Sequence, residues 1–173
     1  MRVHPTMIAL SNPLSSVSGV FNAICVTGDA VGETIFYGRG AGEFPTASAV
    51  VADIVDISRD ILTGAKSRVP LLSFKPDFIK NKKIRKISRI KSKFYFRFSV
   101  IDKPGVLSKI SGILGENNIS IASVIQKERK EGEEVSVVMM AHEALEEDVE
   151  KALTFIDKLP VVLKDTVLIR VEE

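Results

Sequence analysis

The sequence predicts an α+β fold, in which the C-terminal part forms a four-stranded antiparallel sheet with two helices on one face. Two observations lead to this prediction. After residue 93, four segments show the alternation of apolar and polar residues that is typical of strands, and two segments show the spacing of a helix. These segments follow one another in the order β-α-β-β-α-β. Before residue 66, two strand-like runs flank a short turn, and a helix-like run follows them.

Length and composition are those of a globular protein. The 173 residues allow one medium domain or two small ones, and 45% apolar residues are too many for a disordered chain. No apolar run approaches the roughly 20 residues of a membrane-spanning helix, and the first residues lack a secretion signal. We therefore expect a cytoplasmic protein with no membrane partner. The net charge of +2 is too small to imply a polyanionic partner by itself.

The first 65 residues predict a β-hairpin and a helix, which together make a partial α/β segment. Residues 19–27 and 31–37 are the expected strands, joined by a short turn that contains Gly28 and Asp29. Residues 46–57 are the expected helix. Its apolar face holds Val50, Val51, Ile54 and Ile57. Two strands and one helix bury too little surface to fold as an independent domain. We therefore expect this segment to be part of a larger domain.

Residues 66–93 predict a basic linker. Lysines and arginines there face a single acid, Asp77, and Pro70 and Pro76 interrupt any regular period. A solvated connector is favoured over a nucleic-acid-binding arm, because the run lacks the interleaved aromatic residues that stack on bases.

Residues 94–173 predict the second domain. Its first strand places Phe94, Phe96, Phe98 and Val100 on one face. The expected strands are 94–101, 119–127, 134–142 and 167–171, and the expected helices are 104–114 and 145–159. Cys25, in the earlier hairpin, has no internal partner and is expected to be a buried strand residue rather than a reactive thiol.

The turn Asp102-Lys103-Pro104-Gly105 is the first candidate site. It leads from a strand into a helix, where backbone N–H groups without helical partners can bind an anion. Gly105 would let a ligand approach closely, so the carboxylate of an amino acid could dock there. The alternative is an ordinary helix start capped by Asp102.

Residues 101–107 and 117–121, within the β-α-β-β-α-β order, resemble the ACT family of amino-acid-sensing domains. The resemblance covers residues 94–173 and implies a ferredoxin-like fold. It also implies an effector site at the interface of paired domains, with sheets joined edge to edge in a homodimer. The effector-binding residues that it implies are Asp102, Gly105, Asn117, Asn118 and Ile119.

The loop from Gly38 to Ala47 is the second candidate site. Its spacing fits neither the dinucleotide fingerprint nor the P-loop. Together with three earlier segments, however, it resembles the end of the catalytic region of homoserine dehydrogenases. The segments that carry this resemblance are Val3-His4-Pro5-Thr6, residues 17–23, residues 28–34 and residues 38–53. Residues 1–65 would then be the C-terminal remnant of that catalytic domain.

The second resemblance implies an oxidoreductase of threonine and methionine biosynthesis. That family transfers a hydride between NAD(P)H and aspartate semialdehyde or homoserine, and threonine is a common inhibitor. The glycine loop would contact the nicotinamide end of the cofactor. The implied contact residues are Gly38, Gly40, Ala41 and Gly42.

We expect the chain by itself to be inactive, with no catalytic residue and no metal site, because the catalytic motifs of the family are not found in it. His4, beside Pro5, is expected to be structural. One alternative is a free-standing ACT-type module whose first residues serve only in assembly. Another is RNA binding, since RNA-recognition folds share the same strand order. The run Val135–Met140 opposes it, because it has no aromatic ring to stack on a base.

Overall fold

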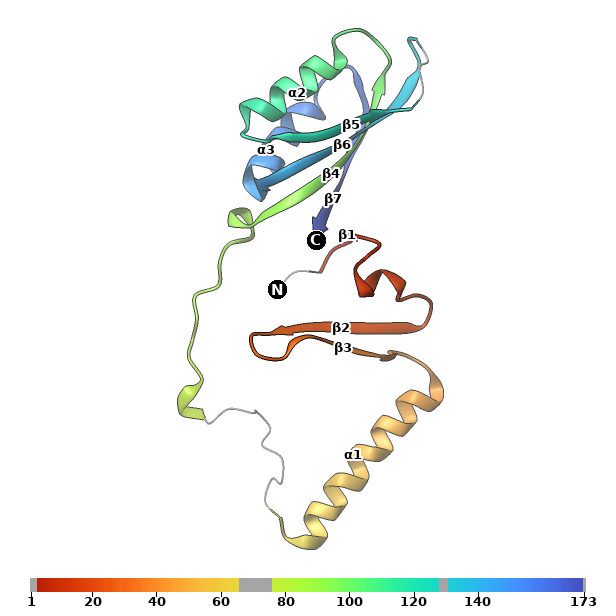
Figure 1. The fold of residues 1–173 in the computed structure, drawn as a ribbon, viewed down its shortest axis with the longest axis vertical. Coiled ribbons are helices and arrows are strands. Elements are labelled where there is room, and N and C mark those ends of the chain that lie inside the picture. The colour runs from red at the N-terminus through yellow and green to blue at the C-terminus, as the bar shows by residue number, and fades with distance from the viewer. Residues whose placement is uncertain (1–2, 66–75, 128–130, 173) are drawn as a thin grey trace. The chain divides into compact units, whose positions relative to one another are not determined.

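The computed structural model describes residues 3–65, 76–127 and 131–172, and Figure 1 shows an α+β chain, as predicted. Two compact units are present. The hairpin unit is Leu10–Lys83, and the sheet unit is Met1–Ala9 together with Ile84–Glu173. Residues 1–9 therefore fold with the sheet unit, whereas the sequence led us to group them with the segment up to residue 65.

The sheet unit contains a five-stranded sheet in the order β1-β7-β4-β6-β5. Its strands are β1 (Thr6–Ile8), β4 (Lys91–Ile101), β5 (Ile121–Gln126), β6 (Glu134–Leu145) and β7 (Val162–Glu172). The last four pair antiparallel in the predicted ferredoxin-like order, and β1 adds a fifth strand parallel to β7. Three residues are too few to show an alternating pattern, so the sequence did not predict β1.

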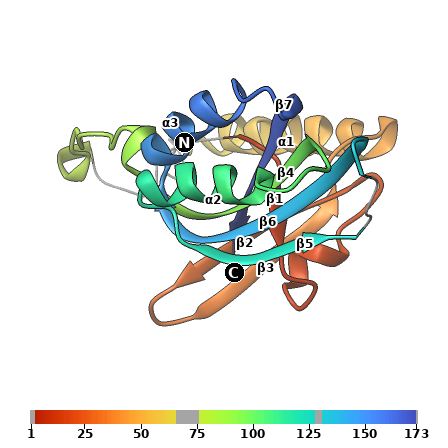
Figure 2. The same cartoon turned by 90° about the horizontal axis from the view of Figure 1, so that it is seen from above.

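Both helices of the sheet unit cover the same face of the sheet (Figure 2). They are α2 (Val106–Glu116) and α3 (Glu146–Ile156). The alternating aromatic residues of β4 point toward them, and Phe94, Phe96 and Phe98 are fully buried. The rings of Phe96 and Phe98 stack with centroids 5.7 Å apart. The predicted period is confirmed, and because these rings are inaccessible they cannot stack on RNA bases.

The hairpin unit consists of β2 (Phe21–Gly28), β3 (Gly32–Arg39) and the helix α1 (Glu43–Thr63), with short 3-10 turns at Pro13–Ser16 and Pro76–Phe78. The predicted hairpin and helix are confirmed. No residue of α1 is buried, and its apolar face stays exposed. Among the described helices, α1 included, none combines the length and apolarity needed to cross a membrane.

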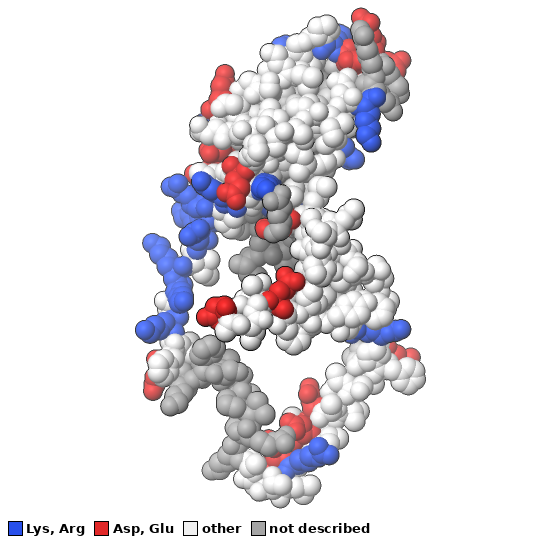
Figure 3. Space-filling model, in the orientation of Figure 1, with Lys and Arg blue, Asp and Glu red and all other residues white. Residues whose placement is uncertain are grey.

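The predicted linker is only partly described, because residues 66–75 lie outside the described ranges. Residues 77–86 are exposed, and Figure 3 shows Lys and Arg side chains along this segment. A 3-10 turn at Ile87–Arg89 leads into β4. That strand begins earlier than predicted, because Lys91 and Ser92 pair with the end of β6.

Candidate functional site

A cavity of about 270 Å³ lies where β4 meets α2. Asp102 and Gly105, both predicted from the sequence, lie in its wall. The other residues that line it are Val100, Ile101, Lys103, Pro104, Val106, Leu107, Gln126, Glu131, Val135 and Val137. The sequence did not predict Gln126 or Glu131, because only pairing of distant strands brings them to this turn.

The start of α2 forms the polar part of this cavity. Gly105 is its N-cap residue with φ of 87°, no side chain caps the helix, and the first turn contains no acidic residue. Amides in a first turn lack partners within the helix, and the helix dipole makes this end positive. The arrangement suits a small anion. The N-cap residue is therefore Gly105 rather than Asp102.

Asp102 is held in place by the turn between β5 and β6. Its backbone N–H donates to the Glu133 carbonyl at 2.9 Å, and its own carbonyl accepts from the Gly132 N–H at 2.9 Å. Its Oδ1 accepts a hydrogen bond from Gln126 Nε2 at 3.4 Å. The cavity thus combines a helix start and Lys103 with the carboxylates of Asp102 and Glu131.

Gly105→Ala is expected to lower the free energy of unfolding by about 1–2 kcal/mol, because φ of 87° places a Cβ in the left-handed region. No atom lies within 4 Å of the position that a Cβ would take, so the cost is one of backbone strain alone. Gly105→Asn is the control, since asparagine tolerates this region better. Urea unfolding measures both variants. An equal loss for both would contradict the assignment.

Asn117, Asn118 and Ile119 do not line this cavity. They follow the other end of α2, which at 11 residues separates them from Gly105 by about 16 Å. Asn117 Nδ2 donates to the Ile113 carbonyl at 2.8 Å, Asn118 has φ of 59°, and Ile119 is in the core. Within one chain these residues terminate a helix, and an effector contact by them stays a prediction.

The glycine loop joins β3 to α1. The Gly40 N–H donates to the Val20 carbonyl at 3.4 Å, and a Cβ at Gly40 would overlap the side-chain amide of Asn22. Gly42, with φ of 140°, is the N-cap of α1. Gly38, Gly40, Ala41 and Gly42 are all exposed. The loop therefore presents open backbone, which a cofactor could approach closely.

The sequence also led to expectations for the side chains of Cys25 and His4. Cys25 lies in β2 as predicted but is half-buried rather than buried. Desolvation and the neighbouring Glu33 raise the pKa of the Cys25 thiol, which makes the thiol less reactive at neutral pH.

The ring of His4 makes a local contact, in which its Nδ1 lies 2.9 Å from Thr6 Oγ1. In the described ranges, no group of three or more His, Cys, Asp or Glu side chains could hold a metal ion.

Comparison with known proteins agrees with both resemblances. Residues 1–55 match the homoserine dehydrogenase family, and residues 94–160 match the ACT domain family. Homoserine dehydrogenase of Pseudomonas aeruginosa is 41% identical over 174 residues, and that of Neisseria gonorrhoeae is 41% identical over 172 residues. Over its whole length the chain is similar to homoserine dehydrogenases. It corresponds to a C-terminal region of that family with an ACT domain.

Solved structures of homoserine dehydrogenases cover nearly the whole chain. The enzyme of Thiobacillus denitrificans superposes with a TM-score of 0.83 at 40% identity, over 99% of this chain and 38% of that one. The Staphylococcus aureus enzyme at pH 6.0 gives a TM-score of 0.53 at 26% identity, over 97% and 36%. The chain spans about 40% of the length of the curated homoserine dehydrogenases from Pseudomonas and Neisseria.

A second polar cluster lies on the ACT sheet and was not predicted. The Ser99 hydroxyl donates to Glu134, and Lys164 Nζ lies 2.5 Å from Glu134 Oε1. The three residues come from β4, β6 and β7, so no local sequence signal joins them. Hydrogen bonds from Lys164 and then Ser99 lower the pKa of the Glu134 carboxyl.

Glu134→Gln is expected to weaken the acid sensitivity of this domain. A carboxylate with a lowered folded-state pKa stabilises the fold above its unfolded pKa of about 4.3 and loses that contribution as pH falls through the folded pKa. The difference in urea midpoint between pH 7 and pH 3 should therefore be smaller in the variant. Glu143→Gln, at an exposed position of the same strand, is the control. A pH difference unchanged from wild type would refute the role of Glu134.

Proposed function

We propose that this chain is the C-terminal regulatory portion of a homoserine dehydrogenase and that its ACT domain binds an amino acid, with threonine as the first candidate. The cavity beside the uncapped start of α2 carries this proposal. It offers a site for an anion together with carboxylates for a cation, and a free amino acid has both charges.

The wall of the cavity complements each part of threonine. The α-carboxylate would bind the first-turn amides of α2, which Gly105 leaves open because no Cβ stands in front of them. The ammonium group would face the carboxylates of Asp102 and Glu131. The side-chain amide of Gln126 would reach the hydroxyl, and Val135 would contact the methyl group.

Titration calorimetry with each proteinogenic amino acid tests this proposal. Threonine should bind saturably, and Asp102→Asn should weaken its binding by tenfold or more while keeping the size of the side chain. Asp165→Asn, an acid on β7 outside this cavity, is the matched control and should bind as wild type does. Absence of saturable heat with every amino acid would refute the site.

In the whole enzyme, the hairpin unit would complete the catalytic domain. The exposed apolar face of α1 supports this role, since such a face calls for a covering partner. NAD(P) would supply the hydride chemistry, and Gly38, Gly40, Ala41 and Gly42 would contact its nicotinamide end. These four residues are exposed, so their backbone is accessible to a cofactor. A free-standing ACT module would leave the face of α1 without a function.

We further propose that the chain alone is catalytically inactive and acts in the cytoplasm. The assay follows NADPH oxidation with aspartate semialdehyde and the purified chain. No turnover above background is expected, and turnover would refute the proposal.

The ACT domains are proposed to pair edge to edge as a homodimer, as the family implies. Asn117, Asn118 and Ile119 of one chain would then approach the cavity of the other. This arrangement would give these residues the effector contact that they lack within a single chain.

A further inference from the structure

The described part of the predicted linker carries exposed cations and exposed apolar side chains together. Residues 78–87, which we call the basic segment, contain five lysines and arginines and no acid. All five cations are exposed, and Figure 3 shows Lys and Arg side chains along this stretch of the chain. They are Lys80, Lys82, Lys83, Arg85 and Lys86.

The apolar side chains of the basic segment are its second feature. Phe78 is 69% exposed, Ile79 is 55% exposed, Ile84 is 84% exposed and Ile87 is 47% exposed. A connector that is only solvated needs no such residues, since polar ones keep a segment in water. Their exposure therefore indicates a surface that binds an apolar partner as well as a negatively charged one.

The cations of the basic segment are not neutralised by the rest of the described chain. None of the five forms an ion pair with another described residue. Arg89, which follows the segment, differs from them because it pairs with Glu147 at 3.4 Å. A cluster of roughly four to eight lysines and arginines attracts the head groups of anionic phospholipids.

We propose that the basic segment binds the surface of a membrane that contains anionic phospholipids, with its cations at the head groups and its apolar side chains inserted among them. The inference is independent of the proposed effector site. The expectation of no membrane partner rested on the lack of a spanning segment, and binding at a surface needs none. A protein that acts in the cytoplasm meets anionic lipids in the leaflet that faces it.

A nucleic acid is the other polyanion that could meet these charges. Proteins that bind single strands use aromatic rings on which the bases stack, and the basic segment has one ring, that of Phe78. Its three isoleucines offer no stacking surface, but they gain free energy when they leave water for the boundary of the acyl chains. The composition of the segment therefore favours a lipid surface.

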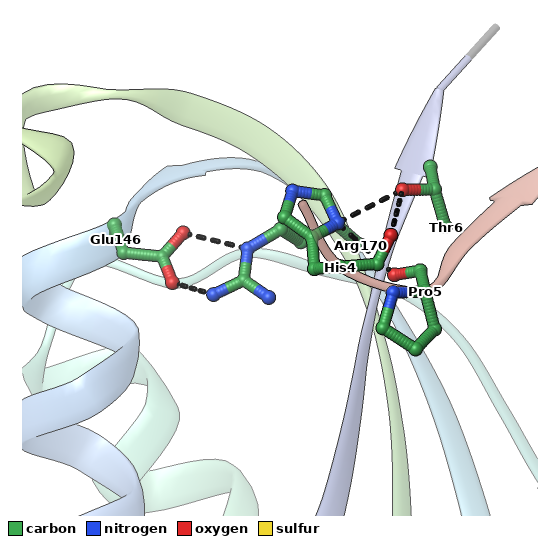
Figure 4. Close-up of polar contacts among 5 residues, drawn as sticks. All are labelled: His4, Pro5, Thr6, Glu146 and Arg170. Atoms are coloured by element: carbon green, nitrogen blue, oxygen red, sulfur yellow. Dashed lines mark hydrogen bonds and ion pairs between the residues drawn. The ribbon is translucent and has the colours of Figure 1, made fainter. Parts of the chain in front are cut away.

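The chain directly after the basic segment is fixed to the ACT domain. The Ile90 carbonyl accepts a hydrogen bond from the Glu146 N–H at 3.0 Å. The carboxylate of Glu146 in turn binds Arg170, as Figure 4 shows. The ion pair between Arg89 and Glu147 lies at the same first turn of α3. A membrane contact by the basic segment would therefore hold the ACT domain close to the bilayer.

Co-sedimentation of the full chain with lipid vesicles tests the charged part of the proposal. Vesicles of phosphatidylcholine and phosphatidylglycerol in equal amounts should bind the chain, and vesicles of phosphatidylcholine alone should bind it much more weakly. Lys82→Gln with Lys83→Gln should lower binding to the anionic vesicles roughly 30-fold, from the usual contribution of two lysines near such a surface.

The control for this pair removes the same charge from another place. Lys109→Gln with Lys151→Gln changes exposed residues of α2 and α3 and should bind the anionic vesicles as wild type does. A wild type that does not bind these vesicles, or equal losses in the two double variants, would overturn the proposal.

A fluorescent reporter tests the insertion of the apolar side chains. The chain contains no tryptophan, so Phe78→Trp introduces a single one. Its emission should move to shorter wavelength with the anionic vesicles, because the indole leaves water. Phe155→Trp on α3, where the phenylalanine is 52% exposed, is the control and should not shift. No shift in Phe78→Trp, or an equal shift in Phe155→Trp, would contradict the proposed contact.

A labelled single-stranded oligonucleotide distinguishes the two polyanions. It should bind the chain more weakly than the anionic vesicles do. Ile84→Ser with Ile87→Ser should weaken vesicle binding about tenfold and leave oligonucleotide binding unchanged, because only the vesicle offers an apolar layer. Oligonucleotide binding tighter than vesicle binding, or vesicle binding unaffected by the serines, would rule out the lipid surface.

Discussion

Arg170→Met is expected to lower the free energy of unfolding of the ACT domain by about 3–5 kcal/mol, the usual cost of breaking a buried ion pair from one side. Glu146 is 0% exposed, and the side chain of Arg170 is 15% exposed. The guanidinium binds both carboxylate oxygens of Glu146. Without it, a buried carboxylate would lose its cation, and its position in the first turn of α3 would offset only part of that loss.

Urea unfolding measures this loss, and two further variants interpret it. Arg89→Met removes an ion pair with Glu147 whose side chains are 67% and 42% exposed, so it should cost about 1 kcal/mol or less. Glu146→Met combined with Arg170→Met should recover part of the stability, since no charge is then buried. If Arg170→Met were as mild as Arg89→Met, the burial of this pair would not matter to stability.

Phe96→Ala is expected to destabilise the ACT domain by about 3–5 kcal/mol. Phe96 lies on β4, with β6 and β7 on either side of it, and is 0% exposed. Its ring lies between those of Phe94, at 6.2 Å, and Phe98, at 5.7 Å. Truncation would remove a buried ring and leave a cavity that neighbouring strands cannot close without shifting.

Phe155→Ala is the control for Phe96→Ala, because it removes the same ring from an exposed position on α3. Its cost should be well below that of the core variant. Urea unfolding of both variants gives their free energies of unfolding. The dependence of these free energies on urea concentration should be the same for both if the folded state stays equally compact. Equal losses of stability at the two positions would show that burial of the Phe96 ring contributes no more to stability than the exposed ring of Phe155.

The turn at the effector site was predictable because its residues are contiguous. Asp102 and Gly105 belong to one strand-to-helix connection, and a glycine before a helix is visible in the sequence. The opposite wall was not predictable. Gln126 reaches the cavity because β5 pairs with β6, which in turn pairs with β4, and Glu131 reaches it through its backbone bridge with Asp102. The pairing of strands that are distant in the sequence depends on which elements share a core. The spacing of residues within a short segment does not reveal it.

The role of Glu146 was also hidden in the sequence. Within the predicted helix it reads as one more acid in the first turn, where the dipole favours a negative charge. The structure buries it against Arg170, which lies 24 residues further along the chain. Likewise, the three residues of β1 form a strand only because they pair with the edge of β7.

The sequence by itself determined the helices and longer strands, their order and the position of the strand-to-helix turn, because the period of apolar residues and the glycines are local properties. Only the tertiary structure decided the fifth strand, the buried ion pair and the wall of the cavity opposite the turn. Each of these depends on contacts between residues far apart in the chain, and such contacts form only when the shared core brings the elements together.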